Sequence, residues 1–507
     1  MASSLLRHTI LAVAISTIIW VYIDTPKSVY FCPLSPEGLR SDWTDENCYF
    51  STSYADAREK FIALGNRLRE QVAASGRGSE LLDLLDVQSI SYDIANADQY
   101  KSLQAINASI PHTISPEKDT IDAILLTMRV PDEHYVDIIH SSGTHGVEGY
   151  LGSAIQIRFL HELFLQNEEA VQHNNKSPSE SSGKVRKILL IHAVNPFGMR
   201  HFRRCNENNV DLNRNVLGAD EAKTVIERDP NHFGYVDMDS ALNPVSSNVV
   251  SKQHRNDLPI ITTYMQELVA ITTCVGSIVK VILMKGYYNA KRTIVSAQYH
   301  KQTGIFYGGS GQWEASIIAL QHSIDEFAGF RLTSSKTEQS EPLETTDTQQ
   351  TVASTQTPSR KIFWIDVHTG LGKYGKYTVI QKERPENNVP WISQLSSVIR
   401  GLEYKQANNG KAVSAGYEQT VGFVNGDLLC PSPSCFSITQ EFGSRSGVAV
   451  VLALILENKG FNWGNYEFAY LTSNAFQPQR LSWRRTTLRG GMETLHAATQ
   501  FKLSPTQ

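Results

Sequence analysis

Residues 136–149 read VDIIHSSGTHGVEG and combine a strand pattern, a turn and two metal-binding residue types. The run VDIIH is short and apolar, which indicates a buried strand, and helical spacing begins at Val147. A strand that leads directly into a helix is typical of an α/β fold. His145 and Glu148 are three positions apart, so on a helical turn their side chains face the same way. Such a pair can bind zinc, although it also occurs on solvated helix faces.

Similar alternation continues along the chain. Short apolar runs predict strands at 121–126, 136–141, 187–193, 278–285, 362–367, 377–381 and 436–441. Helical spacing predicts helices at 53–86, 147–166, 257–271, 312–330 and 444–458. We therefore expect a mixed, mainly parallel sheet with helices on both faces, in which reactive residues collect at the carboxyl ends of strands.

Composition excludes several classes of protein. The chain has 507 residues, of which 41% are hydrophobic and 19% charged, so it is not a wholly disordered chain. Its formal net charge of -4 argues against a dedicated nucleic-acid binder, and no nucleic-acid partner is expected. Beyond the first 25 positions no run of 18 apolar residues occurs, which excludes a polytopic membrane protein.

The N-terminal residues 1–23 contain the uncharged run TILAVAISTIIWVYI at 9–23. This run is either a signal peptide or an uncleaved signal anchor, a transmembrane helix that would cross the membrane once. Asp24, Thr25 and Pro26 follow it without a small-residue cleavage pattern, which favours the anchor with its amino end in the cytosol. We therefore expect a secretory-pathway protein with a luminal or extracellular body, secreted if the segment is cleaved. The sequons at Asn107 and Asn175 would make it a glycoprotein.

The remaining chain divides by composition. Residues 24–50 are expected to be an irregular lead-in, 51–480 a single domain and 481–507 a C-terminal tail. The polar stretches 173–186 and 333–360 are interpreted as disordered inserts, with a domain linker as the alternative for the second. Two cysteine pairs are close enough to form disulfides in an oxidising compartment, Cys32 with Cys48 and Cys430 with Cys435. Cys205 and Cys274 are expected to be buried thiols.

Three further motifs follow predicted strands. Asn195-Pro-Phe-Gly198 introduces a segment rich in Arg and Asn that ends at Asn215; its guanidinium groups suit recognition of a carboxylate, although Asp211 could simply pair with Arg214. Asp366 and His368 share one face of a strand and precede a glycine-rich loop, as a metal ligand with its partner or as a buried hydrogen-bonded pair. The segment ITQEFG at 438–443 ends a strand with a carboxylate that could act as a general base.

Together these motifs resemble the zinc carboxypeptidase superfamily in residue type and order. The segments SGTHGVEG, NPFGMRHFRR, GIFYGG, WIDVHTGLG and ITQEFG are most similar to an uncharacterised, carboxypeptidase-like domain-of-unknown-function branch. That branch is also similar to the aspartoacylase and succinylglutamate desuccinylase deacylases. The resemblance covers residues 50–475 and implies one zinc-binding domain of that α/β type.

The resemblance also implies a role for each matching residue. The residues that would bind one zinc ion are His145, Glu148 and His368. Arg204 would stabilise the oxyanion, Asn213 and Arg214 would hold a substrate carboxylate, and Glu441 would be the general base. The tyrosine that such peptidases place over the substrate is less evident, and Tyr417 is a candidate, while Tyr307 could line the pocket.

Three functions remain open from the sequence. The first is a zinc-dependent hydrolase of C–N amide bonds, either a carboxypeptidase or an acyl-amino-acid deacylase, whose substrate carries a free carboxylate. The second is a non-catalytic luminal binding protein that contains zinc. The third is a membrane-anchored scaffold in which the motifs serve packing. The intact Glu441 and Arg204 favour the first.

Overall fold

The computed structural model describes residues 45–74, 84–94, 119–173, 184–243, 272–328, 361–381, 404–408, 411–412, 420–462 and 468–503, with short gaps, and several residues between 32 and 43. Several sequence predictions lie outside the described residues: the apolar segment 1–23, the helix at 257–271, the insert at 333–360, Tyr417 and the sequons at Asn107 and Asn175. Of the insert at 173–186, the two edges belong to regular elements and the middle lies outside. Within the described ranges, none of the helices is both long and apolar enough to span a membrane.

The described strands form one nine-stranded sheet in the order β1-β2-β4-β3-β5-β9-β6-β7-β8. The strands are β1 (Leu84–Asp93), β2 (Thr120–Arg129), β3 (Asp137–Ser142), β4 (Val185–His192), β5 (Ile362–Tyr374), β6 (Tyr377–Gln381), β7 (Tyr404–Asn408), β8 (Lys411–Ala412) and β9 (Cys435–Gly443). The central strands β4, β3, β5 and β9 are parallel, while β2 and β6 pair antiparallel at either side of them. The prediction of a mixed α/β fold with a parallel centre is confirmed.

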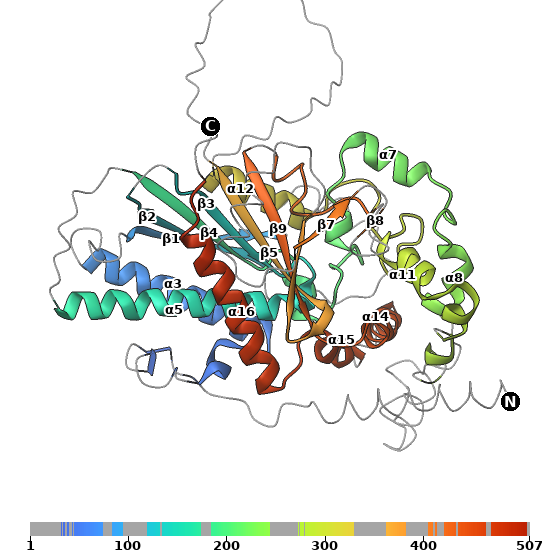
Figure 1. Ribbon diagram of the computed structural model, residues 1–507, viewed down its shortest axis with the longest axis horizontal. Coiled ribbons are helices and arrows are strands. Elements are labelled where there is room, and N and C mark those ends of the chain that lie inside the picture. The colour runs from blue at the N-terminus through green and yellow to red at the C-terminus, as the bar shows by residue number, and fades with distance from the viewer. Residues whose placement is uncertain are drawn as a thin grey trace, which may run out of the picture.

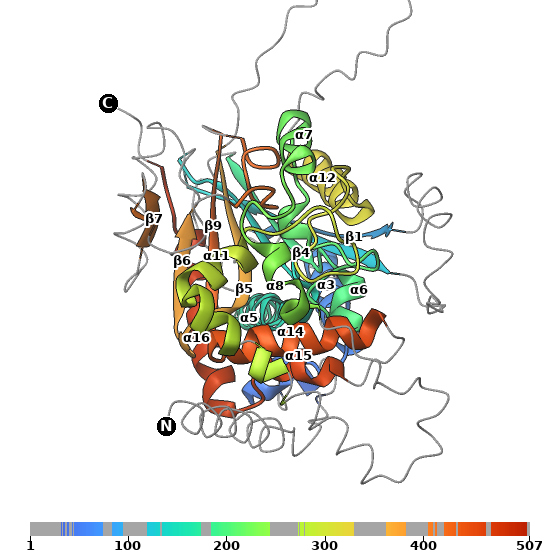
Figure 2. The ribbon, with the colours of Figure 1, turned by 90° about the vertical axis from the view of Figure 1, so that its right-hand side faces the viewer.

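Helices cover both faces of this sheet (Figure 1). One face packs against α3 (Tyr54–Ala74), α5 (Gly149–His173) and α16 (Leu481–Thr499), and the other against α12 (Ala315–Ala328). The remaining helical elements are η1 (Glu46–Tyr49), η4 (Gly146–Glu148), α6 (Pro196–Arg200), η5 (Leu212–Arg214), α7 (Ala219–Glu227), α8 (Tyr235–Leu242), α11 (Tyr287–Val295), α14 (Gly447–Asn462) and α15 (Ala469–Phe476). Of these, α8, α11, α14 and α15 lie together at one side of the sheet (Figure 2).

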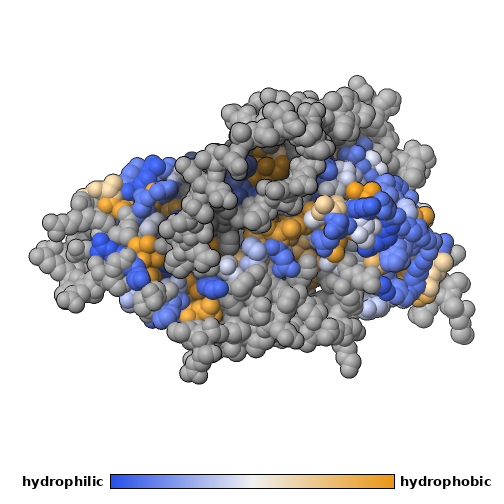
Figure 3. All heavy atoms as spheres, turned by 90° about the horizontal axis from the view of Figure 1, so that it is seen from above, coloured by the Kyte–Doolittle hydropathy of each residue, from blue (hydrophilic) through white to orange (hydrophobic). Residues whose placement is uncertain are grey.

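Along the central strands, side chains point alternately to the two faces of the sheet, which determines which residues lie together on one face. On β5, Phe363, Ile365 and Val367 belong to the core under α5 and α16, whereas Trp364 belongs to the core under α12. Because successive side chains of a strand point to opposite faces, Asp366 and His368 lie on the same face as Trp364. The helices α8, α11, α14 and α15 share a separate core. Seen from above, the surface at the α7 side is mostly hydrophilic, and apolar residues gather in a hollow nearer the middle (Figure 3).

Two predicted elements are wrong in type. Residues 279–285, predicted as a strand, are helical, and Val275 beside them is fully buried in the α8–α14 core. Val275, Val279 and Ile282 all pack in this core at helical spacing, which an unbroken apolar run conceals. Leu84 and Leu85, predicted at the end of the first helix, open strand β1 instead.

Two predicted boundaries also change. Residues 481–499, expected in the tail at 481–507, form α16, whose Trp483, Leu488 and Leu495 are fully buried in the main core. Polar residues between these apolar positions hide the helical spacing in the sequence. The expected irregular lead-in contributes η1 and the buried Trp43 to the same core.

Both predicted cysteine pairs are disulfides. Cys32 is bonded to Cys48, which ties the lead-in to η1, and Cys430 is bonded to Cys435 at the start of β9. Cys205 and Cys274 are free and buried, as predicted.

Candidate metal centre and its cavity

The candidate centre lies at the carboxyl ends of the parallel strands β3, β5 and β9. Gly143 follows β3 with a φ of +71°, a left-handed conformation that suits glycine, and it turns the chain into η4. His145 is the N-cap residue of η4 and Glu148 its last residue, while His368 is within β5. Side chains distant in sequence therefore converge where these three elements meet.

The Asn-Pro-x-Gly motif explains how η4 reaches its place. Asn195 caps α6 by accepting a hydrogen bond from the Gly198 backbone N–H at 2.8 Å, and Pro196 occupies the first helical turn. Gly146 packs directly on this turn, where a Cβ atom would lie 2.1 Å from the carbonyl carbon of Gly198. The Gly146 N–H donates to the carbonyl of Arg204, so the motif joins η4 to the arginine segment.

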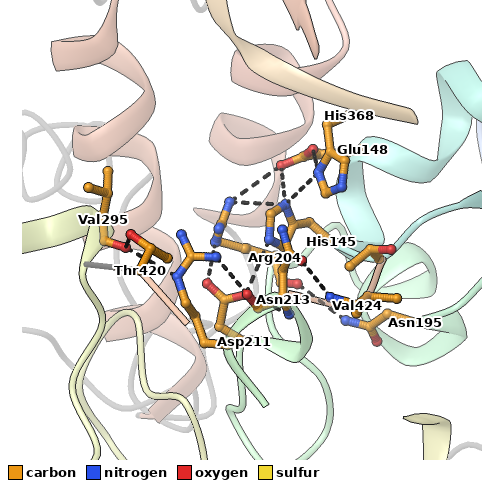
Figure 4. A network of polar contacts seen from close by, with 12 residues as sticks. His145, Glu148, Asn195, Arg204, Asp211, Asn213, Val295, His368, Thr420 and Val424 are labelled. Atoms are coloured by element: carbon orange, nitrogen blue, oxygen red, sulfur yellow. Dashed lines mark hydrogen bonds and ion pairs between the residues drawn. The ribbon is translucent and has the colours of Figure 1, made fainter. Parts of the chain in front are cut away.

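Three buried ligand-type side chains point toward one another (Figure 4). His145 Nδ1 lies 2.8 Å from Glu148 Oε1, and His368 Nδ1 lies 3.1 Å from Glu148 Oε2. The two Nδ1 atoms are themselves 3.1 Å apart. A tetrahedral zinc ion with bonds of about 2.0 Å would need ligand atoms about 3.3 Å apart, close to these distances. This cluster could hold a metal ion.

Carboxylates orient both imidazoles for metal binding. The Nε2 of His368 lies 2.7 Å from Asp366 Oδ2, and the Nε2 of His145 lies 3.2 Å from Asp211 Oδ1. When the Nε2–H is donated to the carboxylate, each neutral imidazole has an Nδ1 lone pair directed at the centre, as metal binding requires. Asp366 itself accepts hydrogen bonds from other buried hydroxyl groups, those of Ser141 and Thr144.

Arg204 and Asp211 complete one side of the centre. Arg204 Nε donates to Asp211 Oδ2 at 2.9 Å, and its Nη1 lies 3.4 Å from Glu148 Oε1. Asp211 thus joins Arg204 and His145, whereas the sequence suggested Arg214 as its partner. Burial opposes ionisation of Asp211, but Arg204 and His145 hold its pKa well below the usual value. Its backbone N–H donates to the carbonyl of Tyr307 in GIFYGG.

Glu441 lies beside His368, because the two residues are register partners of β9 and β5. Its Oε1 accepts a hydrogen bond from the Leu371 backbone N–H at 2.9 Å. Burial, and next the charge of Glu148, raise the pKa of Glu441 to about 7. Burial also disfavours the charged Glu148, but His145 and His368 keep its pKa below the usual value.

Charge supports a cation at the centre. Four buried carboxylates surround it: Glu148, Asp211, Asp366 and Glu441. Burial opposes protonation of His368, yet Asp366 and Glu148 raise its pKa well above the usual value. The surroundings therefore favour positive charge between the ligand atoms.

Asn213 and Arg214 lie in η5 and line the same cavity. Asn213 Oδ1 accepts from the Val424 N–H at 3.0 Å, and Arg214 Nε donates to the Val295 carbonyl at 3.1 Å. These groups therefore hold backbone segments together at the cavity wall. Phe306 lines the cavity, while Tyr307 is buried next to it.

A cavity of 310 Å³ joins these residues. Its lining includes the cluster of His145, Glu148 and His368 together with Arg204 and Glu441. The structure thus brings together the predicted metal ligands, Arg204, Asn213, Arg214 and Glu441, whereas Tyr307, predicted to line the pocket, is not among the described lining residues.

Other residues at the centre have no clear sequence pattern. Asp211 contacts His145 across 66 positions, and nothing in the sequence identifies this partner. The Thr369 N–H donates a hydrogen bond to Glu148 Oε2 at 2.9 Å. In the sequence, the only sign that Thr369 belongs to the site is that it follows His368. The Thr369 hydroxyl is buried without a hydrogen-bond partner among the described residues, and this residue lines the cavity.

The protein thus has a mixed α/β fold, with a buried His–Glu–His cluster at the carboxyl ends of its central strands. Residues 116–334 and 340–490 match a family described as "Protein of unknown function (DUF2817)". The chain belongs to this family. A comparison with curated proteins finds no match.

Proposed function

We propose that the protein is a zinc-dependent hydrolase of C–N amide bonds, either a carboxypeptidase or an acyl-amino-acid deacylase. The observation that carries this proposal is the convergence of two carboxylate-oriented Nδ1 atoms and Glu148 beside Glu441. Two imidazoles and one carboxylate form a common ligand set of catalytic zinc, which leaves a position for water.

The chain's own residues suit each part of such a reaction. Bound zinc lowers the pKa of water and polarises the substrate carbonyl. Glu441, the register partner of His368, can accept the proton of the attacking water and return it to the leaving nitrogen. Arg204, whose Nη1 lies next to Glu148, can stabilise negative charge that develops on the carbonyl oxygen.

The experiment combines metal analysis with one substitution. We expect about one zinc per chain in purified residues 24–507, and its loss in His368→Ala. Glu441→Gln should retain zinc but lose amide hydrolysis by about 10²–10⁴-fold, because its neutral amide cannot accept a proton. Glu70→Gln is the matched control, since Glu70 is an exposed residue of α3 and should leave the rate unchanged.

Other outcomes favour the alternatives. Zinc binding without hydrolysis of any peptide or acyl amino acid would favour a non-catalytic zinc-containing protein. Full activity in Glu441→Gln would remove the general-base mechanism. Absence of zinc after reconstitution would leave a scaffold.

We further propose that the body lies in the secretory pathway or outside the cell. The two disulfides support this, because such bonds persist mainly in oxidising compartments. Protection of the body from added protease in sealed microsomes would test it, and digestion there would contradict it.

A further inference from the structure

The wall of the cavity is formed largely by aliphatic side chains from four helical segments. They come from α8, the helical residues 279–285, α11 and α14. Its principal aliphatic members are Met238, Leu242, Ile282, Ile294, Val448 and Val451. Burial of one methylene group against such a surface contributes about 0.8 kcal/mol, which multiplies affinity about fourfold.

This aliphatic wall continues to the molecular surface. Tyr287 lines the cavity and is also 56% exposed. Leu283 and Met284, beside the lining residue Ile282, are 66% and 70% exposed. Exposed apolar side chains thus follow the lining residue Ile282 along the chain, and exposed apolar surface of this kind is often found at ligand-binding sites.

A second part of the lining is polar and comes from β9. Ser437, Thr439 and Glu441 alternate along the strand and therefore share one face. Asn425 joins them, with its Nδ2 donating to Thr439 Oγ1 at 3.2 Å. The polar row extends from Glu441 toward the start of β9, whereas the aliphatic α14 begins after the end of β9. Glu441 is therefore the member of the polar row that is nearest to α14 along the chain.

Hydrogen-bonding capacity separates an acyl chain from a peptide at the aliphatic wall. Each further amide of a peptide would need donors and acceptors, and an unpaired buried polar group costs about 1–3 kcal/mol. An acyl chain has no such groups. Cationic side chains at the lining, those of Arg204, Arg214 and Lys291, favour a substrate with a free carboxylate.

We infer that the cavity takes N-acyl amino acids with a long aliphatic acyl chain, which lies along the aliphatic wall while the amino-acid part lies along β9. This inference rests on the proposed amide hydrolysis and narrows its substrate class. Water adds its oxygen to the acyl carbon, the C–N bond breaks, and the nitrogen receives a proton. The products are a fatty acid and a free amino acid.

The test is a chain-length series on the zinc-loaded protein. N-acetyl-, N-octanoyl- and N-dodecanoyl-L-glutamine are compared with the peptide N-acetyl-Leu-Gln. We expect kcat/KM to rise about fourfold per methylene until the cavity is filled, and to exceed that of the peptide. A flat or falling series, or a preference for the peptide, would overturn the inference and leave amide hydrolysis standing.

Matched substitutions locate the effect. Val451→Trp fills the aliphatic wall, so the ratio of dodecanoyl to acetyl kcat/KM should fall at least tenfold. Val236→Trp is the control, because Val236 is 49% exposed on α8, outside the cavity lining, and the ratio should stay unchanged. Equal ratios in both variants would contradict the assignment.

A binding measurement keeps the inference separate from catalysis. Calorimetry on Glu441→Gln should show tighter binding of N-dodecanoylglutamine than of N-acetylglutamine, with a negative heat-capacity change. If the zinc-loaded wild type hydrolyses none of these substrates but the variant shows this binding, the hydrolase proposal fails. The assignment of the cavity to long acyl chains then stands. If neither binding nor chain-length dependence is found, the inference fails.

Discussion

Asp366 determines which nitrogen of His368 faces the metal centre. It accepts the Nε2–H, and hydroxyl groups of Ser141 and Thr144 hold it in place. An asparagine there could donate its own N–H to Nε2, which would move the imidazole proton to Nδ1. We expect Asp366→Asn to lower zinc affinity about 10–100-fold in a chelator competition titration.

A second buried carboxylate on the sheet provides the control for that substitution. Asp137 begins β3, at the end of the strand away from the centre, and accepts from the Lys187 N–H at 2.7 Å. Asp137→Asn should leave zinc affinity unchanged. Equal losses in both variants would mean that Asp366 acts through general stability.

Gly146 has no room for a side chain. Its Cβ would lie 2.1 Å from a backbone atom of Gly198, so η4 or α6 would have to move. We expect Gly146→Ala to lower the free energy of unfolding by about 3 kcal/mol or more in urea denaturation. At helical Gly276, no described atom outside the local helix backbone lies within 4 Å of the corresponding position, and Gly276→Ala should be neutral or stabilising by up to about 1 kcal/mol.

Helix α16 supports the strand that carries Glu441. Trp483 Nε1 donates to the Gly443 carbonyl at 2.9 Å, and Gln440 Nε2 donates to Thr494 Oγ1 at 2.7 Å. Leu488 on the same helix is fully buried, so Leu488→Ala should cost about 2–5 kcal/mol in the free energy of unfolding. Leu481→Ala, at a position 41% exposed, should cost less than about 0.5 kcal/mol. Similar losses for both would contradict this packing.

The sequence predicted most central elements correctly, because their apolar runs were bounded by polar residues or glycine. Strands β3, β5 and β9 are examples. It failed at 279–285, where the apolar residues run together and both periods fit. It also failed at α16, where threonine, arginine and glycine separate the buried positions. In these cases tertiary packing decides the structure.

Two glutamates away from the metal centre should make the free energy of unfolding depend on pH. Asn206 and Asn208 both donate to Glu314 Oε2 at 2.7 Å, and Glu207 lies between them in sequence. Part of Glu207 reaches solvent, but its Oε1 is buried without a hydrogen-bond partner among the described residues. Burial, and next the charge of Glu314, raise the pKa of Glu207 from 4.5 to about 8.

A raised carboxyl pKa favours the folded state at low pH. The stabilisation is complete below about pH 4.5 and is lost as pH rises to about 8, at less than about 1.4 kcal/mol per pH unit. The side chain in Glu207→Gln is neutral at both pH values. The free energy of unfolding of the variant minus that of the wild type should therefore be larger at pH 8 than at pH 5. Denaturation of both proteins at the two pH values measures this difference, and an equal difference at both would contradict it.

The composition of the candidate site was more predictable than its connections. The motifs identified His145, Glu148 and His368, which the structure brings together. They did not identify the pairing of Asp211 with His145 and Arg204, because hydrogen-bond partners depend on the path of the folded chain. The aliphatic wall was also beyond prediction, since α8, α11 and α14 are far apart in sequence and each reads as ordinary core.

The support of β9 by α16 has a consequence for synthesis of the protein. A ribosome releases β9 well before residues 481–499, so the buried face of this strand first meets water or a chaperone. Until those residues emerge, the nascent chain lacks the contacts to Gly443 and Gln440. A nascent chain that stops before α16 would contain all the site residues. It would still expose the apolar face of the sheet that α16 normally covers, and chaperones and proteases recognise such surfaces.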